Sequence, residues 1–406
     1  MRILIISQWF EPEPFLKGLG FVKELQMYGH EVEVLTGFPN FPGGRIYPGY
    51  SLRFFQREYI DSIRINRVAL FPSHNNSGFL RIINYTSFLL FGSIIGPFVI
   101  SKPDIVYVYN LPTAGLIANI LRFFFQAKFV LDIQDLWPES VTRSGMMDNR
   151  LLNKVLNWFS NKIYKSADHL TVLSPGFMNE LEKRKIDRKK ISIIYNWCSE
   201  TIGLNTSEKK TENSILPKFD GKFNVVYAGT MGKMQALDSV IEAAVLISKT
   251  DYKIQFWLIG DGIEVNNLKS LVQAYAIVNV TFVPRLNENE ISEVMKRADL
   301  LLVHLKNDPL FEITIPSKIQ AYMFSCKPIL VGVKGDAAKL VEDAEAGITC
   351  EPENPISIAE AIVRFSQLEP LVRQKFAENG KKYYQENLSR RIGVKCFSDI
   401  FNALVE

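Results

Sequence analysis

The chain has 406 residues, 47% hydrophobic and 22% charged, a composition typical of a folded globular protein and a length that suggests two domains. The formal net charge of +4 is too small to indicate nucleic acid, and we expect no nucleic-acid partner. The four cysteines are widely spaced, which argues against a zinc motif or a disulfide framework and fits a reducing cytoplasm.

The first half of the chain alternates apolar runs that favour strands with stretches that favour helices. The expected strands are residues 2–7, 31–36, 65–70, 104–109, 128–133, 169–174 and 191–196. A first helix is expected at about residues 21–28. Continuous apolar strands separated by helices indicate a parallel, doubly wound sheet covered on both faces. Met1 leads directly into the first strand, so we expect no secretory signal peptide.

Residues 85–100, YTSFLLFGSIIGPFVI, are the most membrane-like stretch of the chain. Glycines and Pro97 interrupt this run and Lys102 ends it, whereas a membrane span needs about 20 apolar residues. We therefore expect a buried or partly membrane-dipping helix rather than a transmembrane one. Basic residues gather in residues 181–190, which a solvated helix end explains as well as an anionic membrane surface does.

The composition becomes polar at residues 199–220, which we interpret as a linker between a first domain, residues 1–198, and a second, residues 221–387. The alternation then restarts, with strands expected at residues 223–228, 253–260, 278–283, 299–305 and 328–333. The pattern predicts two doubly wound α/β domains that face each other across a cleft. The last helix, about residues 388–406, is expected to pack back on the first domain.

Ligands bind beyond the carboxyl ends of the strands in such sheets, so the loops that follow strands are the candidate sites. In residues 11–20, Gly18 and Gly20 would let the backbone approach a ligand and Lys17 would offer charge, although a plain turn explains them equally well. The loop is not GxGxxG, and its glutamates are wrong for a dinucleotide phosphate cradle.

The loop DIQDLWPES, residues 132–140, follows the strand at residues 128–133. Asp135 is a candidate for holding sugar hydroxyls or acting on an acceptor hydroxyl, and Glu139 is the second candidate. The alternative is that Asp132 and Asp135 only cap the next helix.

The loop at residues 228–238, AGTMGKMQALD, follows the first strand of the second domain. Its glycines keep side chains away, Thr230 and Gln235 offer hydrogen bonds, and Lys233 brings charge, which suits a diphosphate. In residues 283–290, Pro284 could hold a flat base by backbone contacts and Arg285 could reach phosphate, although a surface arginine is an equal explanation.

The stretch DPLFEITIPSKIQAYMFSCKPIL, residues 308–330, combines a polar loop carrying Asp308 and Glu312 with a helix that opens near Ser317 and Lys318. First-turn amides, a hydroxyl and an ammonium group together favour an anion, although an ordinary capped helix is the alternative. The sequence has neither HExxH nor GxSxG, its four histidines are scattered, and His304 is expected to be a packed histidine.

These motifs resemble the retaining glycosyltransferases of family 4, which have the GT-B fold. The resemblance runs over almost the whole chain and includes RILIISQWFEPEP, GHEVEVLTGFPNFPGG, DIQDLWPES, VLSPGF, IIYNW, VVYAGTMGKMQALDSVIEAA, WLIGDG and IPSKIQAYMFSCKPIL. The subgroup it resembles builds bacterial O-antigen or capsular polysaccharide.

The resemblance implies that a nucleotide-sugar binds mainly to the second domain and the acceptor to the first. It implies a set of residues at the donor diphosphate, namely Thr230, Lys233, Gln235, Ser317 and Lys318. Glu312 would lie near the sugar hydroxyls, and Pro284, Arg285 and Gln320 near the base and ribose. The family's second glutamate is replaced by Gln320 or Ala321, depending on the alignment.

We therefore expect a retaining transferase that moves a hexose or N-acetylhexosamine from a nucleotide-diphosphate sugar, UDP-linked, onto a glycan. The acceptor is expected to be polyprenyl-diphosphate-linked, with Asp135 and Glu312 at the chemistry and Gly18, Gly20 and Glu139 on the acceptor side. Neither a metal nor another cofactor is expected, and the enzyme would work in the cytoplasm, peripherally on the inner face of the membrane. The alternatives are a nonhydrolysing nucleotide-sugar epimerase and a non-catalytic two-lobed sugar-binding protein.

Overall fold

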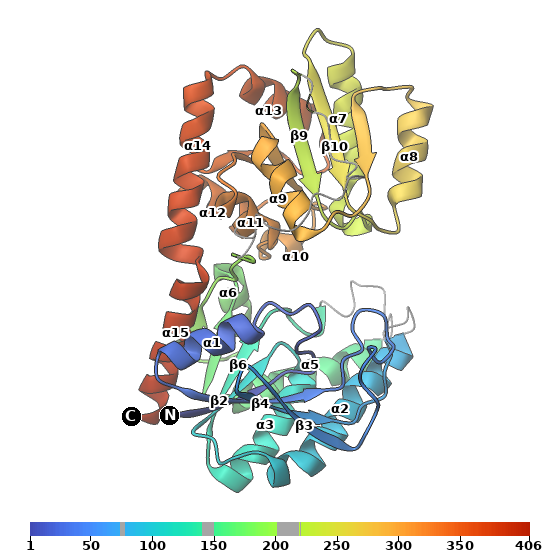
Figure 1. Ribbon diagram of the computed structural model, residues 1–406. Coiled ribbons are helices and arrows are strands. Elements are labelled where there is room, and N and C mark those ends of the chain that lie inside the picture. The colour runs from blue at the N-terminus through green and yellow to red at the C-terminus, as the bar shows by residue number, and fades with distance from the viewer. Residues whose placement is uncertain (74–77, 140–149, 201–218, 220) are drawn as a thin grey trace. The chain divides into compact units, whose positions relative to one another are not determined.

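The computed structural model describes residues 1–73, 78–139, 150–200, 219 and 221–406. They form two compact α/β units (Figure 1), one of Met1–Tyr195 with Arg391–Glu406 and the other of Asn196–Arg390. The expected pair of doubly wound α/β domains is confirmed. Most of the linker predicted at residues 199–220 lies outside the described residues.

The first unit is built on an eight-stranded sheet with the order β3-β4-β2-β1-β5-β6-β7-β8. Its strands are β1 (Arg2–Ile6), β2 (Glu31–Gly37), β3 (Phe55–Ile60), β4 (Ile63–Val68), β5 (Ile105–Tyr109), β6 (Lys128–Ile133), β7 (His169–Val172) and β8 (Ile191–Ile193). The strands pair in parallel except for β3, which runs antiparallel to β4 at the edge. This edge strand was not predicted, because polar side chains in FQREYI leave no continuous apolar run.

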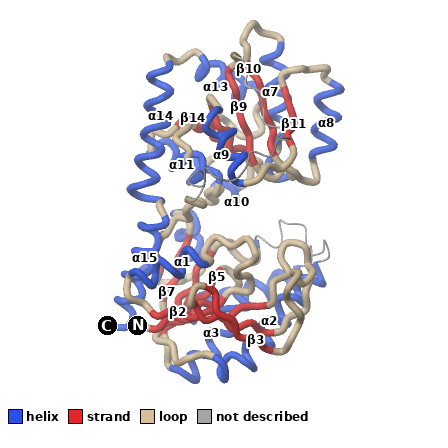
Figure 2. The backbone as a smooth tube through the Cα atoms, viewed as in Figure 1, coloured by secondary structure: helices blue, strands red, loops and turns tan. Residues whose placement is uncertain are grey.

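Helices cover both faces of this sheet, as Figures 1 and 2 show. They are α1 (Leu19–Met27), α2 (Gly78–Val99), α3 (Pro112–Phe125), α5 (Arg150–Ser166), α6 (Pro175–Lys183), the 3-10 turn η1 (Arg188–Lys190) and α15 (Arg390–Val405). Phe397 of α15 packs edge-on against Phe21 of α1, with ring centroids 5.4 Å apart. Ser398 of α15 is hydrogen-bonded to His30 at 2.7 Å, so the last helix is part of the first unit.

Helix α2 is longer than its sequence predicts, because its glycines and Pro97 do not end it. A Cβ on Gly92 would lie 2.7 Å from Ile117 of α3, so this glycine serves the close packing of α2 on α3. Within the described residues, Leu80–Val99 is the one helical stretch that is long and apolar enough to cross a membrane, judged by length and composition alone. Only 22% of its most apolar window is buried.

The second unit has a parallel six-stranded sheet with the order β11-β10-β9-β12-β13-β14. Its strands are β9 (Phe223–Ala228), β10 (Ile254–Ile259), β11 (Val280–Val283), β12 (Leu300–His304), β13 (Ile329–Gly332) and β14 (Gly347–Thr349). Its helices are η2 (Lys233–Gln235), α7 (Leu237–Ser248), α8 (Val265–Ala274), α9 (Glu288–Arg297), α10 (Pro309–Glu312), α11 (Lys318–Phe324), α12 (Asp336–Asp343), α13 (Pro355–Ser366), α14 (Pro370–Tyr383) and the π-helix η3 (Tyr384–Leu388).

Residues of β9, β10 and β12 share one apolar core with residues of α7 and α13, two helices that pack against each other. Because the strands are parallel, β9, β10, β11 and β12 all end at the same edge of the sheet. The loops that follow these four strands therefore meet there, and they include the stretches at residues 228–238 and 283–290.

Candidate active site

A pocket of about 340 Å³ opens at the carboxyl edge of the second sheet. Loops after β9, β10 and β11 form its walls, together with α9 and α11. It brings together three residues predicted for the donor, namely Thr230, Arg285 and Lys318. Asp261 and Tyr322 also line it, and neither was predicted from the sequence to bind the donor. The pocket thus joins loops that are far apart in the sequence.

Lys318 is the first residue of α11 and lies against the end of β9. Its ammonium group donates to the Tyr227 hydroxyl and lies 3.7 Å from the centroid of that ring. Burial lowers the pKa of Lys318 to about 7. Within the described part of the chain, no carboxylate lies within 4.0 Å of this group. A desolvated cation without a counter-ion is a strong site for an anion.

Tyrosine hydroxyls hold the loop after β9 beside Lys318. The Tyr227 hydroxyl donates to the carbonyl of Thr230 at 2.5 Å, and the Ala228 amide donates to the Tyr322 hydroxyl at 3.1 Å. Gly229 has a φ of +141°, and a Cβ there would lie 2.5 Å from Cε of Lys318. A side chain at Gly229 would therefore displace the lysine, which explains why this position is glycine.

The first unit presents the loop of residues 132–139, whose beginning is fixed inside the core. Asp132 is fully buried and forms an ion pair with the equally buried Lys17 at 2.5 Å. The same carboxylate accepts hydrogen bonds from the hydroxyls of Tyr107 and Thr171, at 2.7 and 2.8 Å. Lys17, expected to offer charge to a ligand, is thus used by the fold, and Asp132 is a structural residue rather than a helix cap.

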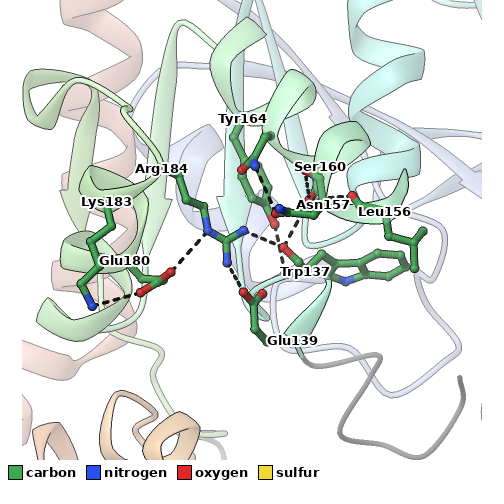
Figure 3. A network of polar contacts seen from close by, with 10 residues as sticks. Trp137, Glu139, Leu156, Asn157, Ser160, Tyr164, Glu180, Lys183 and Arg184 are labelled. Atoms are coloured by element: carbon green, nitrogen blue, oxygen red, sulfur yellow. Dashed lines mark hydrogen bonds and ion pairs between the residues drawn. The ribbon is translucent and has the colours of Figure 1, made fainter. Parts of the chain in front are cut away.

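The end of the same loop is fixed by Arg184 of the segment after α6, as Figure 3 shows. Its guanidinium donates to the Trp137 carbonyl at 2.7 Å and to the Glu139 carboxylate at 2.5 Å. The Trp137 amide donates to the Tyr164 hydroxyl at 3.2 Å, and the Ser160 hydroxyl donates to the Trp137 carbonyl at 3.2 Å. Between these two fixed ends, Asp135 has part of its surface exposed, while burial of its carboxyl group raises the pKa of Asp135 and the Asn110 hydrogen bond opposes that rise.

Two family models match the chain, one on each half. The model described as "Glycosyl transferase 4-like domain" matches residues 19–197, and the one described as "Glycosyl transferases group 1" matches residues 208–383. Together they span most of the sequence. The chain is a GT-B glycosyltransferase.

Curated relatives of this glycosyltransferase carry names of the same kind. It is 25% identical over 287 residues to the probable glycosyltransferase WbjE of Pseudomonas aeruginosa, with 69% of each chain covered. It is 24% identical over 370 residues to the putative colanic acid biosynthesis glycosyl transferase WcaI of Escherichia coli (strain K12), with 86% of each covered. Its fold is similar to that of Anabaena Alr3699/HepE, solved in complex with UDP and glucose, with a TM-score of 0.66, 14% identity and 99% of both chains covered.

Several residues predicted at the donor lie outside the pocket that holds Lys318. Lys233 is exposed and lines a separate pocket with Asp238 and Lys306. The Gln235 side chain accepts a hydrogen bond from the Gly232 amide at 2.9 Å and so closes its own turn. Pro284 lines the neighbouring pocket of about 430 Å³, which Arg285 shares. The glycosyltransferase therefore does not gather all these groups in one cavity.

Gln320 and Ala321, the two residues that could replace the family's second glutamate, have different surroundings at the start of α11. Gln320 is buried, and its amide, oriented to suit its neighbours, donates to the carbonyls of Pro316 and Ser317 at 3.1 Å each. Ala321, not Gln320, lines the pocket. Ser317 is exposed and makes no side-chain cap, so α11 begins at Lys318 with no hydroxyl bonded to its first turn.

The loop predicted around Glu312 contains the short helix α10, which was not predicted. Asp308 caps it by accepting from the Leu310 amide at 2.8 Å, and Pro309 follows in the first turn. Glu312 ends this helix and is exposed. His304 is packed, as expected, with its Nδ1 2.7 Å from the Gln235 carbonyl oxygen.

The glycines predicted on the acceptor side of the glycosyltransferase serve the start of α1. Gly20 is the second residue of that helix. A Cβ on Gly18 would lie 2.2 Å from the Glu11 carboxylate, which accepts from the Leu19 amide at 2.6 Å. Gly18 therefore makes room for the side chain that caps α1. Among the described residues, no three His, Cys, Asp or Glu side chains gather where they could hold a metal ion.

Proposed function

We propose that this glycosyltransferase moves a hexose or N-acetylhexosamine from a UDP-linked sugar to a glycan, with retention of configuration, in the synthesis of a cell-surface polysaccharide. The observation that carries the proposal is Lys318, a desolvated ammonium group in the pocket and without a carboxylate partner among the described residues. A donor diphosphate would supply the missing negative charge. The UDP and glucose bound to Anabaena Alr3699/HepE and the name of WcaI support the donor class and the pathway class.

In this proposal the bond between the anomeric carbon and the β-phosphate oxygen breaks, and the phosphate leaves with the electron pair. Charge therefore grows on the leaving UDP, and Lys318 is placed to stabilise it where water is scarce. The acceptor hydroxyl oxygen bonds to the anomeric carbon from the face that the phosphate leaves. Its proton passes to the departing phosphate oxygen, so the step balances without a metal or a protein base.

Thr230 and Arg285, which line the same pocket, are the remaining donor contacts that we propose. Arg285 is exposed and lines two neighbouring pockets, so it can reach a phosphate bound in the pocket that holds Lys318. Asp135 would hold the acceptor, and Glu312 would contact the transferred sugar. Both are exposed, which leaves their carboxylates open to hydroxyl groups.

The test is incubation of the purified protein with a panel of nucleotide-sugars, each with and without polyprenyl-diphosphate-linked sugars. Transfer predicts nucleotide release that depends on the acceptor, and a product heavier by one sugar in mass spectrometry. An epimerase would change the nucleotide-sugar with no acceptor present, and a binding protein would bind it without turnover. Either of these results across the whole panel would refute transfer.

The lipid-linked acceptor and a location on the inner face of the membrane belong to the same proposal. Apolar side chains of α2 that recur every fourth residue are exposed, namely Leu90, Ile94 and Phe98. Phe123 and Phe124, at the end of the adjoining α3, are exposed as well. Such surfaces are unusual on a protein that meets only water, and a bilayer would cover them.

This membrane contact is tested by sedimentation with vesicles that contain about one-third anionic lipid, a composition that resembles a cytoplasmic leaflet. The wild type should sediment with the vesicles, and the double variant Phe98→Glu, Phe123→Glu should stay in solution because each glutamate would have to enter the bilayer. Equal sedimentation of both proteins would refute this surface as the membrane contact.

A further inference from the structure

Asn110 lies directly after β5, next to the loop that carries Asp135. Its φ is +64°, a left-handed conformation in which asparagine is strained less than most residues other than glycine. Its backbone N–H donates to the backbone carbonyl of Asp132 at 2.8 Å, and this hydrogen bond joins the end of β5 to the end of β6. Strained backbone that the surrounding structure holds in place is found preferentially at functional sites.

The Asn110 side chain makes two hydrogen bonds to a single residue. Its Nδ2 donates to Oδ2 of Asp135 at 3.2 Å, and its Oδ1 accepts from the Asp135 amide at 3.2 Å. Asp132 and Arg184 fix the two ends of the loop, so this pair fixes the remaining exposed middle. Within the described residues, Oδ1 of Asp135 has no hydrogen-bond partner, which leaves one carboxylate oxygen open to solvent.

Three aromatic side chains gather in the first unit, two of them from other segments and the third, Trp137, from the loop that carries Asp135. The ring centroid of Tyr85, on α2, lies 6.2 Å from that of Trp9 and 6.2 Å from that of Trp137. Burial raises the pKa of Tyr85, and the charge of Asp135 adds to that shift, which places the carboxylate near the tyrosine. An open carboxylate oxygen beside amphipathic rings suits a sugar, which presents hydroxyl groups at its rim and C–H groups on its faces.

We infer that Asn110 is a positioning residue for Asp135, and that the pair forms the subsite that takes a hydroxyl group of the acceptor sugar. The inference rests on the proposed function and names the acceptor side of the same reaction. Asn110 holds Oδ2 and the backbone, and thereby aims Oδ1 at the hydroxyl to be bound. The alternative is that the two hydrogen bonds only tie two loops together.

The decisive variant is Asn110→Gly, because glycine keeps the left-handed backbone without strain while the amide is lost. The probes are octyl β-glucoside and octyl N-acetylglucosaminide, with binding followed by NMR saturation transfer in the absence of donor. A hydrogen bond from the sugar to the Asp135 carboxylate is worth roughly tenfold to a hundredfold in affinity, so losing its alignment in the variant should weaken glycoside binding by up to about that factor. UDP affinity should stay within about twofold, because UDP contacts belong to the second unit.

A pH profile separates positioning from a structural role. Asn110→Asp keeps a residue that tolerates the left-handed backbone but sets a second carboxylate against Asp135, which disfavours ionisation of both. The profile of transfer to the octyl glycoside should therefore move to higher pH in this variant. Asn119→Ala serves as the control. It removes the hydrogen bond that the Asn119 amide on α3 donates to the Ser166 hydroxyl on α5 at 2.7 Å, and it should leave both readouts unchanged.

Glycoside binding that Asn110→Gly leaves unchanged would overturn the inference, as would the lack of glycoside binding by the wild type. Equal losses of glycoside and UDP binding with a lower melting temperature would show a structural role and also overturn it. If the wild type binds glycosides through Asn110 but transfers no sugar from any donor, the subsite stands and the proposed transferase function fails. The two failures are therefore distinguishable.

Discussion

Two buried lysines, one in each unit, have opposite surroundings. Lys17 is fully buried, and the Asp132 carboxylate lies 2.5 Å from its ammonium nitrogen. Lys318 is partly buried against the ring of Tyr227, and no carboxylate of the described residues lies within ion-pair distance. Burial lowers the pKa of both lysines, but Asp132 opposes that shift only at Lys17. One charge is thus neutralised within the fold, and the other is left for a ligand.

The comparison teaches that burial alone does not mark a functional lysine. A buried ion pair is self-contained, and its removal chiefly damages the fold. A desolvated lysine without a counter-ion costs the empty protein free energy, which a bound anion returns. The two lysines should therefore respond differently to the same substitution, which can be measured.

The largest effect is expected for Lys17→Met, which leaves the Asp132 carboxylate buried without its cation. Breaking such a pair costs roughly 3–5 kcal/mol, so the free energy of unfolding of the first unit should fall by about that amount. Urea denaturation followed by circular dichroism measures it. Lys23→Met is the matched control, because Lys23 pairs with Asp61 at the surface and its loss should cost about 1 kcal/mol or less. Equal losses in both variants would break the comparison.

Lys318→Met should instead damage catalysis and spare the fold. Losing one preorganised charge at a developing anion costs about 10²–10³-fold in rate, so kcat/KM for the donor should fall by that factor. The free energy of unfolding should not fall, because the variant removes a desolvated charge that no carboxylate of the described residues neutralises. Steady-state kinetics and urea denaturation test both statements. Lys296→Met, which removes an exposed pair with Glu293 in the same unit, should change neither.

The pH dependence of UDP binding gives a third and smaller effect. The pKa of Lys318 is about 7 in the empty protein, so the binding-competent ammonium form is lost as the pH rises above 7. UDP affinity should then fall by up to about tenfold per pH unit between pH 7 and 9, as calorimetry can measure. The Lys318→Met variant should lack this slope. A wild-type affinity that is flat over the range would contradict the assignment of Lys318 to the diphosphate.

The same shift has a defined sign for stability. The folded-state pKa of Lys318 lies below its ordinary value of 10.5, so between pH 7 and 10.5 the unfolded chain holds the extra proton. Raising the pH through this window therefore relieves the cost of the buried charge and stabilises the folded protein relative to Lys318→Met. Below pH 7 both states are protonated and the full cost remains.

The sequence predicts most of the fold because most strands are buried on both faces and read as apolar runs. It misses β3, a half-polar strand at the sheet edge, and β14, which has only three residues. From the sequence, both Lys17 and Lys318 are predicted to be cations near a ligand, one in a loop and the other at the start of a helix. The two lysines differ only in the residue that each contacts, Asp132 for Lys17 and Tyr227 for Lys318. Each of these residues is far from its lysine in the sequence, so the sequence pattern does not show the contact.

Residues that act by positioning other residues are harder to predict from the sequence. Arg184 lies in the basic stretch at residues 181–190, whose lysines are exposed, and nothing in that run marks it as the partner of Trp137 and Glu139. Asn110 gives one weak signal, since an asparagine at the end of a strand favours the left-handed conformation it adopts. Its two bonds to Asp135 depend on the pairing of β5 with β6.

The smallest effect is expected for Lys233→Ala, which tests an exposed lysine of the second unit against the desolvated Lys318. Lys233 came from the same resemblance as Lys318, but it is exposed and lines a pocket with Asp238 and Lys306. A charge about 4 Å from a phosphate through water is worth about 1 kcal/mol, so kcat/KM for the donor should fall by about fivefold or less. The double variant with Lys318→Met should then lose the sum of the two free energies, because the two cations act separately. A loss as large as that of Lys318→Met, or strong coupling between the two, would mean that the diphosphate spans both pockets and that desolvation is not what makes a lysine of this unit functional.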